Sequence, residues 1–93
     1  TMLTGGALKD LANTPRPLPL AVSVDEEGGR VSRLRALIGP SPTARELAQT
    51  QTVDQVYNLA LDRGRKMKDL GITVDLAPVV DVSDAPADSV IGD

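Results

Sequence analysis

Two short apolar segments on either side of one long amphipathic segment most constrain how this chain folds. Residues 20–24 and 72–82 are rich in β-branched side chains, and residues 52–70 between them repeat apolar side chains with the period of a helix. A helix that joins two neighbouring strands makes those strands parallel, and such crossovers are right-handed. The sequence therefore predicts an α/β fold with parallel strands and one long crossover helix.

The expected helix over residues 52–70 carries signals at both ends. Thr52 and Gln55 fit a capping box at its start, and Gly71 fits the position just past its end. One apolar stripe is expected to face the sheet, and it consists of Val53, Val56, Tyr57, Ala60, Leu61, Met67 and Leu70. Gly64 continues this stripe, which predicts a close approach of the helix to the sheet. Basic residues crowd the later turns and predict a solvated face that suits the negative end of the helix, with nucleic-acid binding as the alternative. These residues are Arg63, Arg65, Lys66 and Lys68.

Three shorter segments complete the expected arrangement. Residues 4–13 predict a short helix with Thr4 as its N-cap, and residues 44–48 predict a brief helical turn after a loop. Residues 14–19 contain three prolines and predict an extended linker, with a proline-rich docking ligand as the alternative. Within the second strand segment, Pro78 predicts an end or a bulge, because proline donates no hydrogen bond to a sheet.

The first strand segment ends abruptly in polar residues. Asp25 follows the last valine, at the end of a parallel strand where ligands bind in α/β folds. Gly28 and Gly29 can adopt positive φ and bring backbone N–H groups close to a ligand. Arg30 and Arg33 are spaced to share one side of a helical turn and to donate to oxygen atoms. The pattern suits a polyhydroxylated or anionic ligand, while the alternative is a tight turn that Asp25 merely caps.

Composition excludes several classes of function. The chain has 93 residues, a net charge of −3 and one aromatic residue, Tyr57, which disfavours nucleic-acid binding. It has no cysteine and no histidine, so proton transfer within this segment would fall to carboxylates. No apolar run approaches the roughly 20 residues of a membrane span. We expect no cofactor, no nucleic-acid partner and no membrane span, and the compartment stays open between the cytoplasm and the cell envelope.

Two motifs resemble a known enzyme family. Residues 24–31, Val-Asp-Glu-Glu-Gly-Gly-Arg-Val, resemble the Asp-Gln-Glu-Gly-Gly-Arg-Val signature of glycoside hydrolase family 3, in its bacterial β-N-acetylhexosaminidase branch. Residues 70–82 resemble the next strand of that family, and residues 90–93 resemble the start of its Ile-Gly-Asp-Arg-Ser-Phe motif. The chain departs from the pattern at Glu26, where glutamine is usual, and at Leu76, where phenylalanine is usual.

The resemblance implies a fold and an activity. Residues 1–93 would be an N-terminal piece of a (β/α)8 TIM barrel, truncated at both ends, since a complete barrel needs roughly 250 residues. The remainder of the barrel would be its partner. The parent protein would be a retaining β-N-acetylhexosaminidase that releases terminal N-acetylglucosamine from glycans or peptidoglycan-derived sugars, as in cell-wall recycling. The alternatives are a β-glucosidase of the same family and a non-catalytic sugar-binding segment.

The resemblance also implies roles for individual residues. Asp25 and Arg33 would bind the carbohydrate substrate, whereas the catalytic aspartate and a histidine-aspartate pair would lie beyond Asp93, leaving no catalytic residue in this segment. Five residues would support the site: Glu27, Gly28, Gly29, Arg30 and Asp81.

Two other hypotheses come from the acidic residues alone. Asp25 and Asp81, at neighbouring strand ends, fit the paired carboxylates that glycoside hydrolysis requires, but the resemblance argues against that assignment. A metal site would rest only on the density of acidic residues after the second strand, which are Asp81, Asp84, Asp88 and Asp93. Because their spacing fits no calcium loop, we expect no metal.

Overall fold

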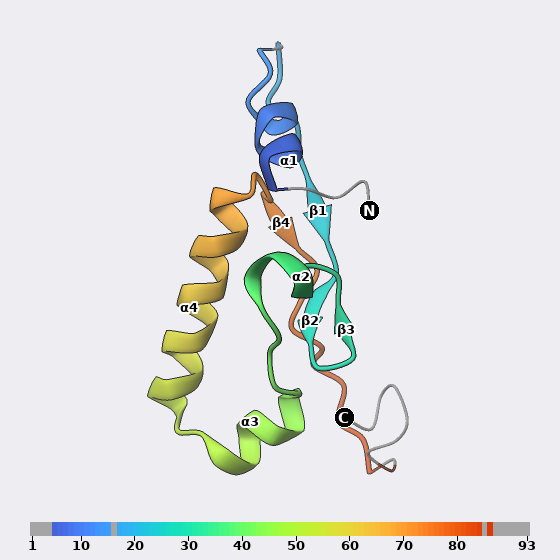
Figure 1. Cartoon of the computed structure of the whole chain (residues 1–93). Coiled ribbons are helices and arrows are strands. Elements are labelled where there is room, and N and C mark those ends of the chain that lie inside the picture. Colours follow the sequence, from blue (N-terminus) through green and yellow to red (C-terminus); the bar gives the residue numbers. More distant parts are fainter. Residues whose placement is uncertain (1–4, 16, 85, 87–93) are drawn as a thin grey trace.

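The computed structural model describes residues 5–15, 17–84 and 86. The described residues form an α/β arrangement in which one helix precedes three short strands, and three further helices lead to a fourth strand (Figure 1). In order, the elements are α1 (Gly5–Ala12), β1 (Ser23–Val24), β2 (Glu26–Gly28), β3 (Val31–Ser32), α2 (Arg35–Ile38), α3 (Ala44–Thr50), α4 (Val53–Asp69) and β4 (Val74–Asp75). The expected N-cap Thr4 and the motif at residues 90–93 lie outside the described residues.

The parallel βαβ unit predicted from the sequence is confirmed. β1 pairs with β4 in parallel, with Ser23 opposite Val74 and Val24 opposite Asp75. The long helix α4 leads into β4 and so forms the connection between the paired strands (Figure 1). Each strand is shorter than predicted, because among the described residues β1 and β4 have only each other to pair with. Regular pairing also ends before Pro78, as expected, and the Ala77–Pro78 peptide bond is cis.

Both predicted ends of α4 are confirmed. The Thr52 N–H donates to Gln55 Oε1 at 2.8 Å, and the Gln55 N–H donates to Thr52 Oγ1 at 3.2 Å, which completes the capping box. At the other end Gly71 adopts a φ of +92°. Its N–H donates to the Lys68 carbonyl, and the Ile72 N–H donates to the Met67 carbonyl, both at 3.0 Å. This pair of bonds is a Schellman motif, so local chemistry fixes where the helix ends.

The face that α4 turns toward the rest of the chain differs from the predicted stripe. Val53 and Tyr57 are 85% and 66% exposed. Gly64 is exposed too, and a Cβ at that position would meet nothing within 4 Å, so the predicted close approach to the sheet is wrong. The less exposed residues of the helix and its C-cap are Val56, Leu59, Arg63, Met67 and Leu70. Arg63 takes a place on this inner face because its guanidinium finds a buried carboxylate.

The apolar core of the described residues is small. Leu34 and Ile72 are its buried side chains, at 1% and 8% exposure. The chain exposes 6800 Å², whereas a compact monomer of its 9.8 kDa mass would expose about 5200 Å². Among the helices of the described residues, none has both the length and the apolar character that crossing a bilayer requires.

Candidate functional site

Asp25 lies directly after β1, as predicted, and β4 holds the backbone on both sides of it. The Val24 carbonyl accepts a hydrogen bond from the Leu76 N–H at 2.9 Å, and the Glu26 N–H donates to Asp75 Oδ1 at 3.0 Å. Asp75 is therefore paired. The Asp25 side chain is exposed, and no hydrogen bond or ion pair joins it to any described residue. This carboxylate is thus presented to solvent from a fixed backbone and caps no turn of the described chain.

The two glycines lie where a β-hairpin reverses direction, Gly28 at the end of β2 and Gly29 in the turn. β2 and β3 are antiparallel, with Glu26 opposite Ser32 and Gly28 opposite Val31. Gly28 and Gly29 have φ values of +95° and +57°, so the expected positive φ is confirmed. The chain therefore folds back at this point, and the expectation that Arg30 and Arg33 share a helical turn is wrong. Arg30 lies in the hairpin turn, whereas the exposed Arg33 lies between β3 and α2.

The hairpin turn packs against the loop before α3. The Gly29 N–H donates to the Ser41 carbonyl at 3.0 Å. A Cβ on Gly29 would lie 2.7 Å from Thr43 Cγ2, which is closer than such atoms approach. Glycine is required here by the close contact as well as by its φ.

One small pocket brings together the five residues expected to support the site. It has a volume of about 100 Å³ and lies between the hairpin, the start of α3 and the segment that follows β4. Its lining includes Glu27, Gly28, Gly29, Arg30 and Asp81. Asp25 and Arg33 do not line this pocket, so the two residues expected to bind sugar stand apart from the supporting group.

Glu26 is the residue whose importance the sequence did not reveal. It is only 5% exposed, and its carboxylate makes three short hydrogen bonds. Oε2 accepts from the Ser32 hydroxyl at 2.7 Å and from Arg63 Nη2 at 2.6 Å, and Oε1 accepts from the Leu34 N–H at 2.8 Å. Burial by itself would raise the pKa of this carboxyl, but these hydrogen bonds and the charge of Arg63 outweigh burial and lower the pKa below its ordinary value.

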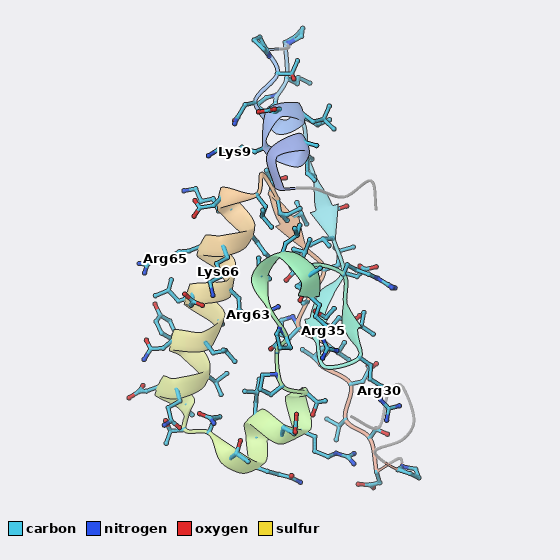
Figure 2. All side chains as sticks on the ribbon, viewed as in Figure 1. Lys9, Arg30, Arg35, Arg63, Arg65 and Lys66 are labelled. Atoms are coloured by element: carbon cyan, nitrogen blue, oxygen red, sulfur yellow. The ribbon has the colours of Figure 1, made fainter. Side chains whose placement is uncertain are left out.

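Arg63 supplies the positive partner from α4. Figure 2 shows its side chain pointing from the helix toward the centre of the chain, whereas Arg65 points away. Besides pairing with Glu26, Arg63 Nη1 donates to the carbonyls of Gly39 and Pro40 at 3.1 and 3.3 Å. The predicted solvated basic face is therefore wrong for Arg63 and confirmed for the other three basic residues, which are exposed. The spacing of Arg63 from Val56, seven residues earlier on the inner face, was the available signal.

Metal binding gains no support from the acidic residues. Among the described residues, no group of three histidine, cysteine or acidic side chains is arranged to hold a metal ion. Asp81 and Asp84 are exposed, and Asp88 and Asp93 lie outside the described residues.

Comparison with known proteins identifies the family. The model of the glycosyl hydrolase family 3 N-terminal domain matches residues 1–93. A protein named Beta-hexosaminidase LpqI from Mycobacterium tuberculosis is 71% identical over 89 residues, which are 95% of this chain and 23% of that protein. A Beta-hexosaminidase from Idiomarina loihiensis is 37% identical over 79 residues, covering 81% of this chain and 23% of the relative.

Solved structures agree with the sequence comparison. The crystal structure of a family 3 glycosyl hydrolase from Mycobacterium smegmatis has a TM-score of 0.88 and 72% identity, covering 99% of this chain and 28% of that one. The structure of M. tuberculosis LpqI has a TM-score of 0.85 and 70% identity, covering 94% of this chain and 26% of that one. The chain thus spans about a quarter of the relatives it matches. It belongs to the N-terminal domain of glycosyl hydrolase family 3.

Proposed function

We propose that this chain forms the first sugar-binding part of a β-N-acetylhexosaminidase. The observation that carries the proposal is the 71% identity, over 95% of the chain, to a protein named Beta-hexosaminidase. The exposed Asp25 carboxylate at the end of a parallel strand supports it, because ligands of such folds bind at that end.

In this proposal, residues 1–93 are part of a (β/α)8 barrel that the rest of the protein completes. The large exposed area and the small apolar core of the described residues, Leu34 and Ile72, support this, because a piece of a barrel has faces that only its neighbours cover. The exposed apolar residues of α4, Val53 and Tyr57, are surfaces that such neighbours would bury.

The residues of this chain then bind and orient the sugar. The Asp25 carboxylate accepts hydrogen bonds from sugar hydroxyls, and the Arg33 guanidinium donates to oxygen atoms, both as charge-assisted bonds. Glu27, Arg30 and Asp81, which line the small pocket beside the hairpin, support the binding residues. The catalytic nucleophile and the acid/base come from the rest of the protein, which cleaves the glycosidic bond in two displacements with retained configuration.

Release of a chromogenic phenol from an N-acetyl-β-glucosaminide tests the proposal. We expect turnover by the complete protein and none by residues 1–93 alone, with the matching β-glucoside as the control substrate. Turnover by the isolated segment would contradict the placement of the catalytic groups. A complete protein that cleaves only the β-glucoside would overturn the choice of sugar.

A further inference from the structure

One carboxylate holds both chain neighbours of Arg33. Glu26 Oε2 accepts from the Ser32 hydroxyl at 2.7 Å, and Glu26 Oε1 accepts from the Leu34 N–H at 2.8 Å. Leu34 is in turn 1% exposed and anchors this point in the core. A single side chain therefore holds the Ser32 hydroxyl before Arg33 and the Leu34 backbone N–H after it, while the Arg33 side chain itself stays exposed.

The same residue is the chain neighbour of Asp25. The Glu26 N–H is held by Asp75 Oδ1 at 3.0 Å, and on the other side of Asp25 the Val24 carbonyl accepts from the Leu76 N–H, just after β4. Glu26 thus connects the two residues proposed to bind the sugar, one through its backbone and the other through its side chain. A movement of the Glu26 side chain would change the separation of Asp25 and Arg33.

Arg63 allows this carboxylate to remain charged inside the chain. The Glu26 side chain is 0% exposed and the Arg63 side chain is 11% exposed, with 2.6 Å between Nη2 and Oε2. A buried carboxylate without a partner would be costly, because it loses its hydration. Arg63 also holds the Gly39 and Pro40 carbonyls, so it joins α4 to the loop that meets the hairpin turn.

We infer that Glu26 is a positioning residue for substrate binding, which sets the relative placement of Asp25 and Arg33, with Arg63 as its counter-ion from α4. The inference rests on the proposed function for the identity of the sugar. The hydrogen bonds of Glu26 are independent of that function. Misplacement of a binding group by about 1 Å can cost about 100-fold in rate. We therefore expect loss of both carboxylate oxygens to lower kcat/KM by at least about tenfold.

Two variants of the complete protein separate positioning from stability. Glu26→Leu combined with Arg63→Met removes both charges together, so it leaves no unpaired charge, and we expect it to lower the melting temperature less than a variant that leaves Arg63 unpaired. It abolishes the acceptors for Ser32 and Leu34, so KM for the chromogenic N-acetyl-β-glucosaminide rises. Glu26→Gln does the opposite: its amide can still bond both neighbours of Arg33, so KM is retained, whereas the unpaired Arg63 lowers the melting temperature.

A purely structural role predicts a different pattern. In that case kcat/KM would follow the melting temperature in both variants, and this result would overturn the inference. The matched control is Asp62→Asn combined with Lys66→Met, which removes an exposed ion pair of 2.9 Å from the same helix. We expect this control to leave both KM and the melting temperature unchanged.

Amide hydrogen exchange at Leu34 gives a readout that needs no substrate. We expect exchange of this N–H to accelerate at least about tenfold in the Glu26→Leu, Arg63→Met protein and to stay slow in Glu26→Gln. Ser32→Ala removes one of the two bonds without changing charge and gives the milder version of the kinetic effect. If wild-type protein fails to cleave the substrate, the proposed function falls while exchange still decides the inference. Slow exchange at Leu34 in the double variant overturns it.

Discussion

Arg63→Met is the substitution that most directly measures the buried ion pair. Methionine keeps an unbranched stem on the inner face of α4 but removes the guanidinium. The Glu26 carboxylate, whose side chain is 0% exposed, then loses its counter-charge. The carbonyls of Gly39 and Pro40 lose their donor at the same time.

Two considerations set the free energy of unfolding that Arg63→Met is expected to lose. Removing one partner of a buried ion pair destabilises a protein by about 3–5 kcal/mol. Without Arg63, the Glu26 carboxylate can take up a proton and so avoid being an unpaired buried charge. At pH 7 this protonation costs about 3.7 kcal/mol for a carboxyl with an ordinary pKa of about 4.3. Protonation therefore caps the loss, and we expect Arg63→Met to lower the free energy of unfolding by about 3–4 kcal/mol.

Urea unfolding of the complete protein, followed by far-ultraviolet circular dichroism, measures this loss. The matched control is Asp62→Asn, which breaks the Lys66–Asp62 pair on the same helix, where the two side chains are 50% and 60% exposed. Exposed pairs of this spacing contribute about 0.3–0.5 kcal/mol. If Arg63→Met costs no more than this control, the pair with Glu26 is not buried in the complete protein and the reasoning fails.

Three further predictions test the site. Asp25→Ala should raise KM and lower kcat/KM at least about tenfold in the chromogenic assay, because contacts to sugar hydroxyls strengthen in the transition state; wild-type kinetics would contradict its binding role. Since the pKa of Glu26 is lowered on folding, its carboxylate stabilises the protein above the unfolded pKa and loses this effect as pH falls through the folded pKa. The difference in unfolding free energy between wild type and Glu26→Gln should therefore be constant above about pH 5 and shrink below about pH 4.5, and a constant difference throughout would contradict this. Gly29→Ala should cost more in urea unfolding than Gly39→Ala, because both have positive φ but only Gly29 would place its Cβ against another side chain; equal losses would exclude the clash.

The parts of the fold that could be predicted from sequence are those set by nearby residues. Thr52 and Gln55 interact within one helical turn, and Gly71 ends α4 through bonds to the preceding turn. The position of Asp25 after β1 followed from the sharp change in polarity along the chain. Each of these features is determined by residues within a few positions of one another, so a local sequence pattern is enough to predict it.

The inner face of α4 could not be predicted in the same way. A count of apolar side chains placed Val53, Tyr57 and Gly64 on the buried stripe, yet all three are exposed. Arg63 counts as polar in any such pattern, and its partner Glu26 lies 37 residues earlier in the chain. The rotation of the helix depends on that distant carboxylate, which no local periodicity reveals.

The chemistry of Glu26 explains why a charge is kept at a buried position beside the site. Judged by the two charges alone, a well-packed apolar pair in place of Glu26 and Arg63 can be as stable, since buried ion pairs often gain little over such replacements. An apolar side chain at position 26, however, has no oxygen to accept from Ser32 and Leu34. Stability alone therefore does not account for this pair. The geometry of the carboxylate does, because its two oxygens accept from the Ser32 hydroxyl and the Leu34 N–H on the two sides of Arg33, while Asp25 precedes Glu26 in the chain.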